Sequence, residues 1–155
     1  MSDENFEGLE GETGAQLRVL TQYIKDMSFE NPNAPRTVGP LPEQPQIAVR
    51  VDVGAQRLGE TEFEVTISLG AEAKIQNELM FLIELDYCGL FRLVNIPGEQ
   101  IEPVLLIECP RMLFPFARRI IADVTRDGGF PPLLIDPVDF VGLYQQRRAE
   151  GQAPN

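Results

Sequence analysis

The order of its hydrophobic patterns constrains the fold of this chain more than any other feature. Four segments alternate apolar and polar residues, at 17–29, 47–53, 63–69 and 79–87, and the spacing becomes helical after them. Each alternating segment predicts a half-buried strand, and we expect the fourth strand to continue with a kink at Gly89. The short connections between most of these segments favour an antiparallel sheet with one covered face.

The first strand assigns its residues to two faces by parity. Leu17, Val19, Tyr23, Met27 and Phe29 share one parity and are expected on the covered face. The polar residues of the other parity, including Asp26 and Glu30, are expected on the exposed face.

Helical spacing follows the strands. Residues 99–108 predict a short helix that Pro110 interrupts, and a second helix should run from there to the Asp-Gly-Gly sequence at 127–129. Asp136 followed by Pro137 resembles a helix N-cap and predicts a last helix that ends near Gln146.

Strands first and helices afterwards predict an α+β fold, with the helices packed on one face of a four-stranded antiparallel sheet. We expect one domain at 15–146, a disordered acidic segment at 1–14 and a flexible tail at 147–155.

Composition excludes several functions. The net charge of -11 makes nucleic acid a poor partner, and the absence of histidine removes His-dependent nucleophiles and the common zinc sites. Cys88 and Cys109 form no metal-binding or disulfide pattern, so we expect two packed thiols. No apolar run is long enough to cross a membrane, and no signal-peptide pattern is present. We therefore expect a cytoplasmic protein without cofactor, metal or catalytic residue.

Three segments resemble the SecB family of bacterial export chaperones. They are YIKDMSFENPNAP at 23–35, FLIELDYCGLF at 81–91, and CPRMLFPFAR with GGFPPLLIDPVDF between 109 and 140. The resemblance covers most of 17–144, although the chain lacks the tryptophan of the family. It implies a homotetramer built as a dimer of dimers. It also implies ATP-independent binding of unfolded preproteins and their delivery to the translocation ATPase SecA.

One candidate docking patch lies on the exposed face of the predicted sheet. Leu82, Glu84 and Asp86 share the parity opposite to the apolar residues of their strand, and a leucine among exposed carboxylates suits a protein-docking surface. The resemblance implies that Asp26, Glu30, Leu82 and Glu84 contact SecA through its basic, zinc-bearing tail. The alternatives are an ordinary solvated face, or a carboxylate site for a metal or for acid–base chemistry.

A candidate client groove gathers apolar residues from the Gly/Pro-rich loop, the last helix and the second strand. The candidates are Phe130, Leu133, Phe140, Leu143, Tyr144, Val49 and Val51. Extended clients would combine apolar contacts with pairing to an edge strand. Ordinary core packing is the alternative for each of these residues.

The helix between 110 and 127 carries an apolar stripe that can serve either the core or an oligomer interface. Its members are Leu113, Ala117, Ile120, Ile121 and Val124.

Two other functions remain open at this level. The first is a SecB-like chaperone of a toxin–antitoxin system, and the second is a small-ligand pocket or enzyme that uses Asp or Glu as a base. The chain has no phosphate-binding GxxxxGK[ST] motif, so client release is expected to depend on competition by SecA.

Overall fold

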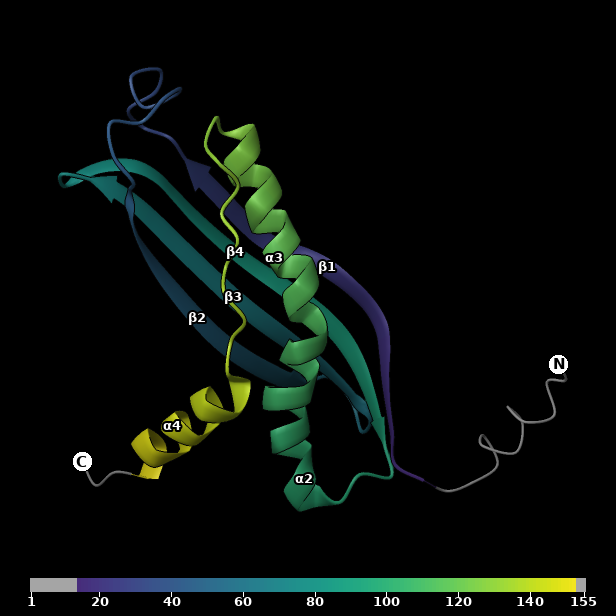
Figure 1. Cartoon of the computed structure of the whole chain (residues 1–155). Coiled ribbons are helices and arrows are strands. Elements are labelled where there is room, and N and C mark those ends of the chain that lie inside the picture. The colour runs from purple at the N-terminus through teal and green to yellow at the C-terminus, as the bar shows by residue number, and fades with distance from the viewer. Residues whose placement is uncertain (1–13, 153–155) are drawn as a thin grey trace, which may run out of the picture.

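The computed structural model describes residues 14–152 and confirms the predicted α+β architecture. The acidic N-terminal segment, apart from Gly14, and residues 153–155 lie outside the described part. Four long strands form one antiparallel sheet in the order β1-β4-β3-β2, which leaves β1 and β2 at the edges (Figure 1). The strands are β1 (Gln16–Glu30), β2 (Gln46–Arg57), β3 (Glu62–Ile75) and β4 (Glu78–Val94).

Two β-bulges in β1 change which side chains reach the core. The pairing of β1 with β4 shifts between Val19 and Thr21 and again between Ile24 and Asp26, so Leu20 and Lys25 are extra residues. Each bulge reverses the alternation of faces. Leu17, Val19, Met27 and Phe29 therefore lie on the helix side, but the prediction that Tyr23 joins them was wrong.

At Gly89, where we expect a kink, the fourth strand keeps its pairing with both neighbouring strands. Gly89 pairs in register with Val65 of β3. A Cβ atom at Gly89 would lie 2.5 Å from the Phe91 ring and 2.8 Å from Leu113. Glycine is needed here because side chains from the core fill this space.

A continuous helical path follows the sheet. It comprises α2 (Gly98–Pro103), a π-helical turn η1 (Val104–Glu108) and α3 (Cys109–Asp127). Pro110 does not interrupt this path, contrary to the prediction. A proline ring crowds the carbonyl of the residue four positions earlier, which here is Leu106. Leu106 lies in the π-helical turn, which is wider than an α-helical turn.

The core lies between α3 and one face of the sheet (Figure 1). Leu113, Ala117 and Ile121 of α3 have no exposed surface, and they pack over fully buried residues of β3 and β4 such as Ile67 and Ile83. We call this side of the sheet the helix side and the opposite side the outer face.

Residues 128–139 form an extended segment that runs back beside α3 to the last helix, α4 (Phe140–Gln152) (Figure 1). The guanidinium of Arg118 holds this segment by donating to the carbonyl of Ile135 at 2.8 Å. Asp139, not the predicted Asp136, caps α4, because its carboxylate accepts the amide of Gly142 at 3.0 Å. The helix also continues past the predicted end at Gln146 and includes residues 147–152.

Candidate functional site

The outer face brings the four predicted docking residues together. Asp26 is opposite Asp86, and Glu30 is opposite Leu82, in the pairing of β1 with β4. Glu84 lies on the same face between Leu82 and Asp86. The second bulge places this part of β1 in the register that the patch requires. We call Asp26, Glu30, Leu82 and Glu84 the acidic patch.

The acidic patch carries more carboxylates than cations. Arg50 of β2 forms an ion pair with Glu84 at 3.1 Å, and the hydroxyl of Ser68 donates to Asp86 at 2.7 Å. Within residues 14–152, neither Asp26 nor Glu30 forms an ion pair with another side chain. A partially exposed leucine among such carboxylates favours a partner that is basic and partly apolar.

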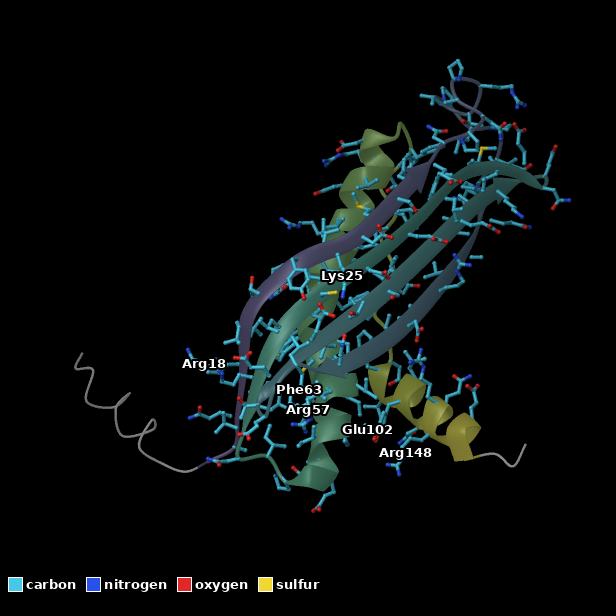
Figure 2. The ribbon with its side chains drawn as sticks, turned by 180° about the vertical axis from the view of Figure 1, so that it is seen from behind. Arg18, Lys25, Arg57, Phe63, Glu102 and Arg148 are labelled. Atoms are coloured by element: carbon cyan, nitrogen blue, oxygen red, sulfur yellow. The ribbon has the colours of Figure 1, made fainter. Side chains whose placement is uncertain are left out.

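The outer face is electrostatically different on the N-terminal side of the acidic patch, where β1 leads up to the second bulge. The hydroxyl of Tyr23 donates a hydrogen bond to Glu64, and the ammonium of Lys25 donates one to the same carboxylate at 2.8 Å. Burial and the hydrogen bond to Glu64 raise the pKa of Tyr23, whereas the bonds from Lys25 and Tyr23 lower the pKa of Glu64. Figure 2 shows Lys25 midway along the outer face, with Arg18 nearer the start of β1. This region is an internally neutralised network that joins β1 to β3.

An apolar groove lies at one end of the helix side, with a volume of about 260 Å³. We call it the loop groove, because two loops supply much of its wall. Its lining residues are Leu41, Gln44, Pro45, Ile47, Met80, Phe81, Phe130, Pro131, Pro132 and Leu133. Two predicted client residues, Phe130 and Leu133, are among them. The other lining residues were not predicted, because they come from strands and loops that only the fold brings together.

Aromatic rings form the inner wall of the loop groove without a tryptophan. The ring of Phe81 lies 5.0 Å from that of Phe130 and 6.0 Å from that of Phe29, between centroids. Such contacts fix ring positions and present an apolar surface to an incoming side chain.

Hydrogen bonds from polar side chains hold the walls of the loop groove. The buried hydroxyl of Thr125 accepts the Leu133 amide at 2.9 Å and donates to α3 carbonyls. The amides of Asn31 and Asn33 donate to the carbonyls of Gly128 at 3.0 Å and Leu79 at 2.8 Å. The groove therefore depends on contacts between distant parts of the chain.

The seven predicted client residues do not form one site. Val49, with 42 % of its surface exposed, and the half-buried Val51 lie along the edge strand β2. Phe140 is buried against Phe114 of α3, with ring centroids 6.0 Å apart, and Tyr144 is also buried. Leu143 lines a small hollow beside Val53, away from the loop groove. For Phe140 and Tyr144, the structure therefore favours the alternative interpretation, which is core packing.

A larger hollow of about 590 Å³ lies at the opposite end of β2, against α2 and η1. The guanidinium of Arg57 lies over the ring of Phe63, 4.7 Å from its centroid, and Glu102 of α2 forms part of the rim (Figure 2). None of the seven predicted client residues lines this hollow. The sequence features that could have indicated this hollow are Arg57 and Phe63, on either side of the β2–β3 turn.

The predicted oligomer stripe divides into two groups. Leu113, Ala117 and Ile121 are buried within the chain's own core, so they leave no surface for a partner subunit. Ile120 and Val124 are partly exposed, and their interface role stays a prediction.

The part of the chain described by the structure contains no cluster of three or more metal-ligating side chains. Both cysteines are buried and unpaired, and burial raises the pKa of Cys109 to about 12. Such a thiol is a poor nucleophile at neutral pH. No helix between residues 14 and 152 is long and apolar enough to span a membrane.

A sheet with an apolar groove on one face and an acidic patch on the other is typical of a protein that binds other chains. Residues 10–151 match the family model described as preprotein translocase subunit SecB. The chain is 62 % identical to the protein-export protein SecB of Parvibaculum lavamentivorans, over all of this chain and 95 % of that protein. It is 59 % identical to SecB of Rhodopseudomonas palustris strain BisA53, over 84 % of this chain and 81 % of that protein.

The chain belongs to the SecB family and is an export chaperone. Its fold is also that of the SecB-like chaperone Rv1957 of Mycobacterium tuberculosis, solved with a peptide of the HigA1 antitoxin. That structure superposes with a TM-score of 0.66 at 14 % identity, over 79 % of this chain and 91 % of that one.

Proposed function

We propose that this chaperone binds unfolded preproteins on the helix side of its sheet and docks to SecA through the acidic patch on the outer face. The observation that carries the proposal is the separation of the two surfaces by the thickness of the sheet. Because neither surface covers the other, a client and SecA can be bound at the same time. Delivery would then need no release before docking.

Client binding begins in the loop groove. Its aromatic wall accepts an apolar side chain of an extended segment, while the neighbouring edge strand β2 offers unpaired backbone groups and the exposed Val49. Such a site favours unfolded chains over native proteins. By mass action, the chaperone withdraws a preprotein from folding and aggregation without nucleotide hydrolysis.

SecA docking uses charge. The uncompensated carboxylates of Asp26 and Glu30 attract a basic segment, and Leu82, opposite Glu30, supplies an apolar contact at one end of the patch. The basic, zinc-bearing tail of SecA has the required chemistry. This contact would position SecA to compete for the client.

A cytoplasmic homotetramer, built as a dimer of dimers, fits the apolar surface that one chain leaves uncovered. Met112 and Phe116 of α3 and Ile24 and Met27 of β1 are exposed, all four outside the acidic patch. Burying such residues between copies keeps the protein soluble, and several grooves on one particle allow a long client to bind with avidity.

Calorimetry on the full chain tests the proposal, with an unfolded preprotein and the isolated SecA tail as separate ligands. We expect both to bind, and saturation with the preprotein to leave the affinity for the tail unchanged. Light scattering on the same sample should give the mass of four chains. A monomer that binds neither ligand contradicts the proposal.

The fold it shares with Rv1957 keeps a second candidate in view, a chaperone that shields an antitoxin. A gene pair for a toxin and its antitoxin beside this gene, together with tighter binding of that antitoxin than of preproteins, would favour it. The high identity to export proteins over the whole chain favours export.

A further inference from the structure

One row of residues crosses the outer face at the acidic patch. Arg50 of β2 is opposite Gly70 of β3, Gly70 is opposite Glu84 of β4, and Glu84 is opposite Ser28 of β1. Because Gly70 has no side chain, Arg50 lies across β3 and donates from Nη2 to the Oε1 atom of Glu84 at 3.1 Å. An arginine two strands away thus neutralises one of the four docking residues.

The contact between Arg50 and Glu84 depends on the absence of a side chain at Gly70. A Cβ atom there would lie 2.9 Å from Nη2 of Arg50, closer than Cβ atoms approach other atoms in proteins, and 3.1 Å from its Nε, which is a tight contact. The backbone of Gly70 is not in the left-handed region, so packing and not conformation is what requires glycine. An alanine would move the flexible end of Arg50 and leave the strand in place.

A hollow of about 250 Å³ lies at this row on the outer face, over β2, β3 and β4. The polar side chains that line it are those of Arg50, Asp52, Ser68, Glu84 and Asp86. Asp52 is paired with Arg147 of α4, and Asp86 accepts the hydroxyl of Ser68. A cation that approaches Glu84 through this hollow meets a guanidinium already in place.

We propose that Arg50 is a built-in competitor of the cation that the docking partner presents to Glu84. The inference rests on the proposed docking of SecA at the acidic patch and adds a determinant of its affinity. A basic partner must exchange its own ion pair for the one between Arg50 and Glu84, so that part of its attraction cancels. The contact thereby keeps docking weak and reversible.

The size of the effect follows from exposure. The side chains of Arg50 and Glu84 retain 70 % and 57 % of their accessible surface. Exposed ion pairs contribute little, and the corresponding change in affinity is about two- to five-fold. Removing the pair should also leave the thermal midpoint of unfolding almost unchanged.

Calorimetry of the full chain with the isolated, zinc-loaded SecA tail tests the competition. We expect Arg50→Gln to bind the tail about two- to five-fold more tightly. Gly70→Ala should tighten binding in the same direction although every charge is retained, because the added methyl group displaces Arg50. Circular dichroism of each variant verifies that the sheet is intact.

Arg18→Gln is the matched control for net charge. Arg18 lies on the same outer face but near the start of β1, and it forms no ion pair with any residue between 14 and 152 (Figure 2). It should change affinity less than Arg50→Gln does. The double variant Arg50→Gln/Glu84→Gln should bind no more tightly than Glu84→Gln alone, apart from the small effect seen in the Arg18 control.

The outcomes separate this inference from the proposed function. If Glu84→Gln leaves the affinity for the tail unchanged, the proposed docking site is wrong. If Glu84→Gln weakens binding but Arg50→Gln does not strengthen it beyond the Arg18 control, the competition is refuted. Tightening by Arg50→Gln without tightening by a folded Gly70→Ala variant also refutes it, because charge alone would then account for the change.

Discussion

The acidic patch and the loop groove lie on opposite faces of the same sheet but are built in different ways. The patch consists of side chains on two adjacent strands, and they are largely exposed. The groove needs two loops, β2 and β4, and it is held by buried aromatic contacts and by hydrogen bonds across the chain. We therefore expect binding and folding to be separable at the patch and coupled at the groove.

The largest effect is expected from Phe81→Ala in the groove wall. Phe81 is buried between Phe29 and Phe130, so its removal should lower the free energy of unfolding by about 3–5 kcal/mol. Affinity for an unfolded preprotein should fall as well. Denaturant unfolding and calorimetry measure the two changes. A stable variant that has lost client binding would contradict the coupling.

A smaller loss is expected from Thr125→Val. The isosteric change removes the acceptor of the partly buried Leu133 amide, and leaving that group unpaired costs about 1 kcal/mol. The groove loop should loosen and bind clients more weakly. Thr125→Ser retains the hydroxyl and should restore most of the client affinity. A defect in Thr125→Ser with none in Thr125→Val would show that the methyl group, not the hydrogen bond, positions the loop.

At the acidic patch, Asp26→Lys or Glu84→Lys should lower affinity for the partner without lowering stability. Each places a cation at the proposed docking site of a basic partner, and we expect affinity for the SecA tail to fall about ten-fold, or about 1.4 kcal/mol. Client affinity and the free energy of unfolding should hardly change, because both positions are exposed. Unchanged affinity for the tail in both variants would reject the patch assignment.

The smallest effect concerns the neutralised network of Tyr23, Lys25 and Glu64, which lies before and at the second bulge. The lowered pKa of Glu64 means that its contribution to stability is present above its usual value of 4.5 and is lost as pH falls through the lowered folded-state value. Glu64→Gln should therefore lose about 1 kcal/mol near pH 7 and less at acid pH. Denaturant unfolding at several pH values measures the difference. A loss that does not depend on pH would exclude the ionised carboxylate as its cause.

Local alternation was sufficient to predict the sheet and the face of the acidic patch. Asp26 and Glu30 lie beyond the second bulge, where parity again matches that of the first residues of β1. Tyr23 lies between the two bulges, so simple parity assigned it to the wrong face. Nothing in the periodicity marks the extra residues Leu20 and Lys25, because bulges depend on the partner strand.

The loop groove was only partly predictable, because its lining comes from segments far apart in the chain. Phe130 and Leu133 stood out in an apolar, Pro-rich loop, whereas Leu41 and Met80 carry no signal of their own. The end of the chain was misassigned for a related reason. Asp136 with Pro137 after it is a good cap in sequence, but Phe140 packs in the core and Asp139 caps the helix instead.

The bulges of β1 also distinguish the two edges of the sheet. A twice-bulged edge presents an irregular row of backbone groups, which disfavours the addition of another strand. The opposite edge, β2, pairs with β3 without a register shift along its whole length, so its free side is regular. At Val53 this free side is already occupied, because the Val53 carbonyl accepts a hydrogen bond from the guanidinium of Arg147 at 2.7 Å. An extended client that adds to this edge therefore has a defined stop, set by the last helix, and a run of β2 from Gln46 to Asp52 on which to pair.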